Sequence, residues 1–294
     1  MGIFTTRKKR KQRIEPRLFS GRAATPAGKV RKRRRSLGRI LFSFVFLVGF
    51  WGAVAGGLGF GYVWLTLDAK GLLQIPAREP GIMLLAADGG VLAEQGAFYG
   101  DEVRLADLPD YVPNAVISIE DRRFRSHWGV DPLGLIRAAY ENYRAGRVVQ
   151  GGSTITQQLA KNLFLEPDRT YWRKAQEMVL AVWLEHRFTK DEILQLYLNR
   201  VYFGGGATGI EKAAQTYYRK SARDLSLAEA ATLAGLLKAP STYNPAIHPE
   251  AAAERARLVL ASMAVTGAIS ENEAARAIDN PAEVQASKYV PAKQ

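Results

Sequence analysis

Residues 170–199 read TYWRKAQEMVLAVWLEHRFTKDEILQLYLN, and this stretch decides the fold class. Trp172, Met178 and Trp183 recur among charged residues as they do on a helix that faces a core. The segment that follows is rich in leucine and isoleucine. Between the two, Thr189 and Glu192 fit a capping box, in which a side-chain oxygen and a carboxylate satisfy free amides at a helix start. We therefore expect two consecutive α-helices.

Similar helix signals occur on both sides of this stretch. Ser226 with Glu229 and Ser270 with Glu273 fit two more capping boxes. Further helices are predicted at 113–120, 132–145 and 249–267. Two short apolar runs, 82–86 and 91–94, flank Asp88-Gly89-Gly90 and predict a small hairpin. Because strands and helices do not alternate, a doubly wound sheet is not expected. The sequence predicts a mainly α fold with a minor β element.

The N-terminal region predicts a membrane anchor. Fifteen of the 41 Lys and Arg residues stand in the first 39 positions beside one acid, Glu15, and the remaining 255 residues are close to neutral. Such a tail could hold phosphates of nucleic acid or of anionic lipid. The 28 residues from Ile40 to Leu67 carry no charge, and this length exceeds both a signal peptide's apolar region and the roughly 30 Å bilayer core. We expect a single transmembrane helix, a cytoplasmic tail, an extracytoplasmic remainder and no nucleic-acid partner.

Composition excludes some chemistry. The chain has 294 residues, which is enough for a buried core, and no cysteine. A thiol nucleophile, a thiolate metal site and a disulfide framework are therefore excluded.

The densest group of reactive side chains is EDRRFRSHWG, residues 120–129. Most acidic pairs are simply solvated at a helix end. Here Ala115, Val116, Ile117 and Ile119 lead directly into Glu120, and a carboxylate at the wall of an apolar cleft is a stronger base. The sequence thus marks this carboxylate as a candidate general base.

Two further clusters add hydroxyl, amide and cationic groups. In GGSTITQQLAKN, residues 151–162, a helix beginning near Ser153 places Thr154, Gln158 and Lys161 at i, i+4 and i+7 on one face. An exposed capped helix would fit the same pattern, and no P-loop is present. In RKAQE, residues 173–177, both cations can flank the carboxylate on one helical face. Such a trio is either a surface ion-pair face or a set of charges for a phosphorylated leaving group.

These three clusters, in this order, resemble the signature motifs of the family 51 glycosyltransferases, the peptidoglycan polymerases. The segments KDEILQLYLN, residues 190–199, and GIEKAAQTYY, residues 209–218, are similar as well. The resemblance covers about 75–245. One departure is Tyr218-Arg219-Lys220, which stands where the family usually has Tyr-Phe-Gly-Lys.

The resemblance implies a lysozyme-like, two-lobed α fold and a role for each matching residue. Glu120 would be the general base, Asp121 its supporting acid and Glu177 a further catalytic carboxylate. The substrate-binding residues would be Phe124, His127, Thr154, Gln158, Lys161, Arg173 and Lys174.

The implied reaction is the polymerisation of lipid II into β-1,4 glycan strands, with inversion and release of undecaprenyl diphosphate, at the bacterial inner membrane. The cations would stabilise the leaving diphosphate, with or without a divalent ion, magnesium or manganese, held by Glu177. Expected partners are lipid II, the growing glycan, membrane lipids and other wall-synthesis proteins. Two alternatives remain open: a lysozyme-like peptidoglycan hydrolase, and a catalytically silent wall-binding membrane module.

The expected organisation has five parts. They are a basic tail (1–39), a transmembrane helix (40–67), a linker with a small β element (68–112), the glycosyltransferase domain (113–245, or from near 75) and a helical lead-in to a second domain (246–294). The chain thus resembles the N-terminal part of a bifunctional class A penicillin-binding protein, with 246–294 leading into the second domain. No Ser-x-x-Lys with a later Lys-Thr-Gly is present, so a transpeptidase site is not expected within these residues.

Overall fold

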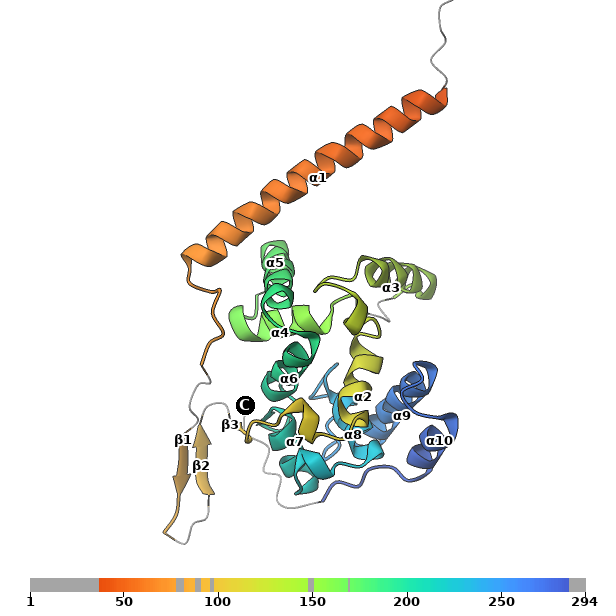
Figure 1. Cartoon of the computed structure of the whole chain (residues 1–294). Helices are drawn as coiled ribbons and strands as arrows, with labels where there is room; N and C mark the ends of the chain where they lie inside the picture. The colour runs from red at the N-terminus through yellow and green to blue at the C-terminus, as the bar shows by residue number, and fades with distance from the viewer. Residues whose placement is uncertain are drawn as a thin grey trace, which may run out of the picture. The chain divides into compact units, whose positions relative to one another are not determined.

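The computed structural model describes residues 37–77, 82–87, 91–95, 98–147, 151–168 and 170–285. These residues are mainly helical (Figure 1), which confirms the predicted fold class. The helices are α1 (Leu37–Ala69), α2 (Tyr111–Glu120), α3 (Pro132–Ala145), α4 (Ile155–Phe164), α5 (Tyr171–Arg187), α6 (Lys190–Arg200), α7 (Ile210–Tyr218), α8 (Leu227–Leu236), α9 (Pro249–Val265) and α10 (Glu271–Asp279). The strands are β1 (Ile82–Leu85), β2 (Val91–Gln95), β3 (Phe98–Tyr99) and β4 (Ala207–Thr208), and short 3-10 turns lie at Leu105–Asp107, Phe124–Ser126 and Ala222–Asp224.

Helix α1 is long and apolar enough to cross a membrane. Its last turns, however, pack against protein: Val63 and Leu67 are buried, and the Tyr62 ring lies 5.9 Å from that of Trp172 on α5. The largely exposed part, from Leu41 to Tyr62, is about 33 Å long at 1.5 Å per residue. That length suffices for the hydrocarbon core of a bilayer. The bounds of the predicted span, 40–67, stay a prediction.

The predicted hairpin strands are present. Strands β1 and β2 pair antiparallel, with Ile82 opposite Gln95 and an irregularity between Leu84 and Leu85. The expected turn, Asp88-Gly89-Gly90, lies outside the described residues. Strands β3 and β4 form a second, parallel pair that the sequence did not predict.

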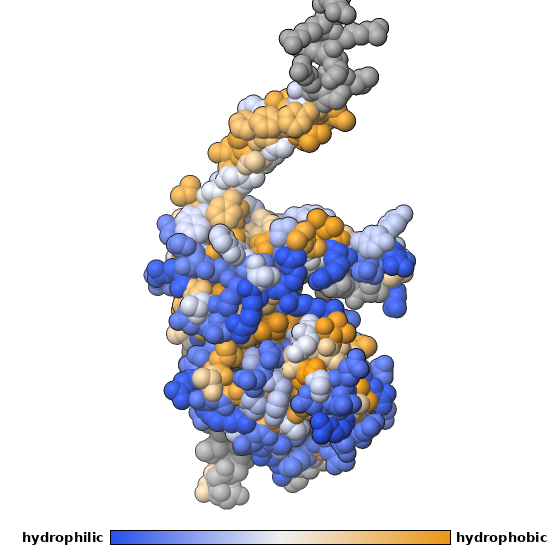
Figure 2. All heavy atoms as spheres, turned by 45° about the vertical axis from the view of Figure 1, so that its right-hand side comes forward, coloured by the Kyte–Doolittle hydropathy of each residue, from blue (hydrophilic) through white to orange (hydrophobic). Residues whose placement is uncertain are grey.

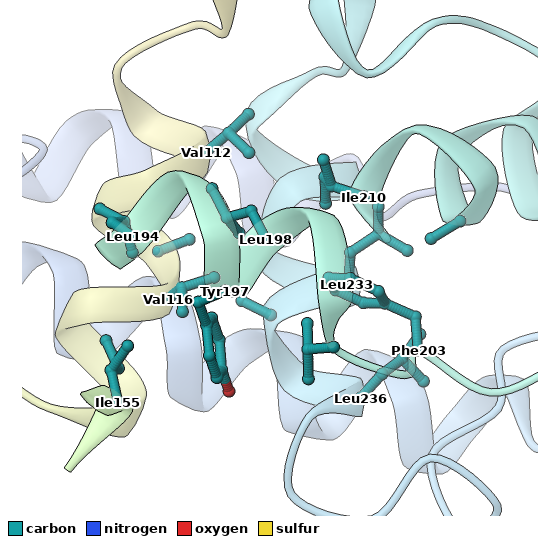
Figure 3. Close-up of a cluster of buried hydrophobic side chains, with 14 of the residues drawn as sticks. Val112, Val116, Ile155, Leu194, Tyr197, Leu198, Phe203, Ile210, Leu233 and Leu236 are labelled. Atoms are coloured by element: carbon teal, nitrogen blue, oxygen red, sulfur yellow. The ribbon is translucent and has the colours of Figure 1, made fainter. Parts of the chain in front are cut away.

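Two groups of helices share one continuous core. Helices α4, α5 and α6 pack together, and α2, α8, α9 and α10 form the second group. Between them lie buried side chains such as Val116, Ile155 and Tyr197 (Figure 3). This arrangement places the end of α2 beside the start of α4, where two of the motifs meet.

The boundary predicted at residue 245 does not coincide with the edge of this core. Val259, Leu260 and Met263 of α9 are buried in the same cluster as α2 and α8. A helix that contributes this much apolar surface belongs to the folded unit rather than to a lead-in. The compact unit extends from Val54 through the last described residue.

Candidate active site

A cleft of about 680 Å³ lies where the two helical groups meet. Its walls come from the end of α2, from α3, from the start of α4, and from Lys238 and Arg255 on the α8–α9 side. Figure 2 shows the surface hollowed on this side of the molecule. Both Glu120 and Asp121 line the cleft, so the first motif is brought to a concave site.

Glu120 is the last residue of α2 and is held by α4. Its Oε2 accepts a hydrogen bond of 2.9 Å from Nε2 of Gln158. The other end of that amide, Oε1, accepts from the Tyr197 hydroxyl at 2.8 Å. The Gln158 amide is therefore engaged at both ends, and Gln158 also lines the cleft, so its predicted contact with substrate stays a prediction.

Asp121 is bound to the N-terminus of α4. Its Oδ2 accepts from the backbone N–H of Ile155 at 3.1 Å and lies 2.8 Å from Nε2 of His127. The Gly129 N–H donates to Nδ1 of His127, so Nδ1 is unprotonated and Nε2 carries the proton that Asp121 accepts. A carboxylate at a helix N-terminus is also favoured by the helix dipole. These bonds fix Asp121 beside Glu120.

Thr154 is the N-cap of α4, and its side chain is buried. Its side chain accepts from Gln157 N within a capping box that the sequence analysis did not identify. Its hydroxyl donates to the Gly129 carbonyl at 2.6 Å. Thr154 therefore joins the start of α4 to the loop that carries His127, although it still lines the cleft.

The third motif forms the ion-pair trio that its spacing predicted. Glu177 is 4% exposed and binds Arg173 through Oε1 and Lys174 through Oε2, the latter at 2.7 Å. Lys174 also donates to Ser153 Oγ at 2.8 Å, and Ser153 lines the cleft. Thus α5 and the loop before α4 are connected at the cleft wall.

Glu177 is the carboxylate that the resemblance offers for a divalent ion. Both of its oxygens are engaged by cations, so a divalent ion would have to displace one of them. Within the described part of the chain, no three His, Cys, Asp or Glu side chains are grouped so as to hold a metal ion.

Two predicted cations line a different cavity. Lys161 and Arg173 border a hollow of about 400 Å³ together with Asn162 and Asp168. They do not line the cleft that contains Glu120, and their predicted role in binding the donor diphosphate stays a prediction. Helix α4 joins the two sites, because Lys161 follows Gln158 by one helical turn.

Phe124 and His127 are buried behind the cleft rather than in its lining. Phe124 is fully buried in the core, with the His127 ring at 6.2 Å and Lys190 Nζ at 4.5 Å from its centroid. Their predicted part in shaping the cleft for substrate stays a prediction. They support the loop that holds Asp121.

Four cleft cations were missed by the sequence analysis: Arg122, Arg137, Lys238 and Arg255. Arg255 is 8% exposed, and its Nε has no hydrogen-bond partner in the described structure. Arg122 and Arg137 stand within or just after the first motif, but Lys238 and Arg255 are more than 100 residues away from it. Only the packing of α8 and α9 against α2 brings them to the cleft.

Another hollow, of about 590 Å³, lies between α8, α9, α10 and residues 281–285. Alanine and proline side chains make up much of its lining. It contains neither the paired carboxylates nor a group of cations, so we place the chemistry in the cleft.

Comparison with known proteins identifies the family of the chain. A family model described as transglycosylase matches residues 88–264. The chain is 50% identical over 196 residues to penicillin-binding protein 1A of Aquifex aeolicus (strain VF5), a match that covers 67% of this chain and 27% of that protein. It is 44% identical over 218 residues to penicillin-binding protein 1A of Pseudomonas aeruginosa, covering 74% of this chain and 26% of that protein.

The chain spans about a quarter of the length of these curated relatives. Among solved structures, penicillin-binding protein 1A from Haemophilus influenzae aligns with a TM-score of 0.44 and 26% identity, over 72% of this chain and 22% of that one.

Proposed function

The chain belongs to the transglycosylase family, and we propose that it is a peptidoglycan glycosyltransferase that polymerises lipid II. The observation that carries this proposal is the cleft, which contains Glu120, the neighbouring Asp121 held by hydrogen bonds, and several cations. A base next to positive charge suits a reaction that removes an alcohol proton from an acceptor that carries a diphosphate.

In the proposed reaction, Glu120 takes the proton of the 4-hydroxyl of the acceptor N-acetylglucosamine. That oxygen attacks the anomeric carbon of the donor N-acetylmuramic acid while the bond from this carbon to the diphosphate oxygen breaks. The electron pair leaves with the diphosphate, so no acid has to protonate it. A single displacement converts the α-linked diphosphate into a β-1,4 bond. Asp121 is engaged by α4 and His127, and it acts by holding the end of α2 in place.

The cations fall into two sets that suit two lipid diphosphates. Lys161 and Arg173 border one cavity, and Lys238 and Arg255 line the cleft that contains Glu120. The first set would neutralise the leaving diphosphate of the donor, and the second would hold the diphosphate of the acceptor. Neither role requires a metal ion at Glu177.

Membrane attachment would place the cleft beside a substrate that stays in the bilayer. Helix α1 would cross the inner membrane with the basic tail in the cytoplasm and the folded unit outside. Several large apolar side chains of α3 are exposed, among them Leu133, Ile136 and Tyr143. We expect them to rest on the lipid surface, since exposed apolar groups of this kind mark an interaction site.

Incubation of lipid II with the purified protein tests the proposal. We expect glycan polymer from the wild type and a loss of about a hundredfold or more in Glu120→Gln, which keeps the shape of the side chain but not its basicity. Cleavage of mature peptidoglycan without polymer would instead identify a hydrolase. An inactive wild type would favour a silent binding module.

A further inference from the structure

The segment KDEILQLYLN, residues 190–199, matches the family but has no part in the reaction described above. Most of it forms α6, and one of its side chains reaches the site through a single intermediate. The Tyr197 hydroxyl contacts the Gln158 amide, which in turn contacts Glu120. We propose that Tyr197 is a positioning residue that holds the Glu120 carboxylate through Gln158; this inference rests on the proposed function.

The direction of the hydrogen bonds follows from the chemistry of the three groups. An ionised carboxylate only accepts, so Gln158 must present its NH₂ to Glu120. Its carbonyl oxygen then faces Tyr197, whose hydroxyl donates to it over 2.8 Å. Without that hydroxyl, the carbonyl oxygen would be left unpaired, and an unpaired buried acceptor is unfavourable. The amide would then turn toward water in the cleft and release the carboxylate.

Tyr197 is rigid enough to fix a partner. Its side chain is fully buried, and Figure 3 shows its ring beside Val116 of α2, with the hydroxyl as the one oxygen among the labelled side chains. Burial, followed by the nearby carboxylates of Glu120 and Asp121, raises the pKa of the hydroxyl well above its ordinary value. The hydroxyl therefore remains a proton donor throughout the range in which the enzyme would work.

Helix α6 is itself fastened to the segment that precedes α2. The Asn199 side chain accepts from Val103 N at 3.0 Å and donates to Val103 O at 2.8 Å. Gln195 Oε1 accepts from Leu105 N at 2.9 Å. These bonds hold α6 to the chain leading into α2, the helix that ends at Glu120. The positions of Tyr197 and of the base are thus coupled by two routes.

The test is a double-mutant cycle on the kinetics of lipid II polymerisation by the full chain in detergent. Tyr197→Phe keeps the ring and removes the hydroxyl, and Gln158→Met keeps the length of the side chain and removes both hydrogen bonds. We expect each variant to lower kcat by about ten- to hundredfold. Tyr197→Phe should change KM little, because Tyr197 does not line the cleft. The double variant should be no slower than Gln158→Met alone, since Tyr197 acts only through Gln158.

Tyr217→Phe is the matched control. Tyr217 is a buried tyrosine of the same core, and its hydroxyl donates to the Phe203 carbonyl at 3.2 Å, away from the cleft. Its loss should disturb folding about as much as Tyr197→Phe while leaving kcat close to that of the wild type. Thermal unfolding of each variant shows whether it is folded, and Gln158→Met tests the chain of contacts from its other end should Tyr197→Phe not fold.

The outcomes separate the two proposals. If the wild type makes no polymer, the proposed function fails and this inference falls with it. If the wild type is active, the inference is overturned when Tyr197→Phe retains wild-type kcat, when its effect and that of Gln158→Met multiply, or when Tyr217→Phe is equally slow.

Discussion

Replacing Asp121 by asparagine should destabilise the folded unit markedly, even though the two side chains have almost the same shape. The carboxylate accepts two hydrogen bonds, from Ile155 N and from His127, at the N-terminus of α4. A hydrogen bond to a charged group contributes ~1.5–3 kcal/mol and one between neutral groups ~0.5–1.5 kcal/mol. The substitution therefore loses about 1 kcal/mol from each bond, and about 1 kcal/mol more from the helix dipole. We expect the free energy of unfolding to fall by about 3 kcal/mol.

Thermal unfolding in detergent, followed by circular dichroism, measures this change. For a folded unit of this size, 3 kcal/mol corresponds to a fall in Tm of roughly 6–12 °C. Asp131→Asn is the control, because Asp131 is also buried at the cleft but has an unpartnered Oδ1 and only a 3.5 Å ion pair with Arg123. Its Tm should change by no more than about 3 °C. Equal shifts in the two variants would refute the assignment of Asp121 as the link between α2 and α4.

Two other substitutions test single features. Glu177→Gln removes the negative charge that binds both Arg173 and Lys174. Because the Lys174 side chain is 38% exposed and so partly screened by water, we expect the free energy of unfolding to fall by only about 2 kcal/mol and the polymerisation rate to fall at least tenfold. Unchanged values of both would show that the trio is not needed. Arg219→Gly should raise the Tm by about 1–4 °C, because Arg219 ends α7 in the left-handed backbone region at φ 55°, where glycine relieves strain. A lower Tm would show that the arginine side chain compensates for that strain.

The helix starts could be predicted because the residues that determine them are neighbours in sequence. The capping boxes at Thr189, Ser226 and Ser270 all form as predicted. The box at Thr154 was not identified, although its Gln157 stands at the usual position three residues on. The departure from the family pattern at Arg219 is also local. The family's usual glycine suits a helix end in the left-handed region, and in this chain an exposed arginine takes that conformation at the end of α7.

The partners of the site residues could not be predicted in the same way. The sequence placed Thr154, Gln158 and Lys161 on one face of a helix, which is their arrangement on α4. It could not show that the Thr154 hydroxyl donates to the Gly129 carbonyl or that Gln158 lies between a tyrosine and the base. Both depend on how α4 packs against α2 and α6, and side-chain periodicity does not report packing partners. Lys238 and Arg255 reach the cleft for the same reason.

Helix α4 links the two halves of the proposed reaction. Its first N–H group holds Asp121, its next turn holds Glu120 through Gln158, and Lys161 one turn further borders the second cavity. From residue 154 to residue 161 a helix rises about 10 Å. A displacement in which a base acts on one side of the anomeric carbon and cations act on the other requires these groups to keep a constant separation. A single capped helix, fixed at its N-terminus by Asp121 and in its middle by Tyr197, provides that separation more reliably than loops would.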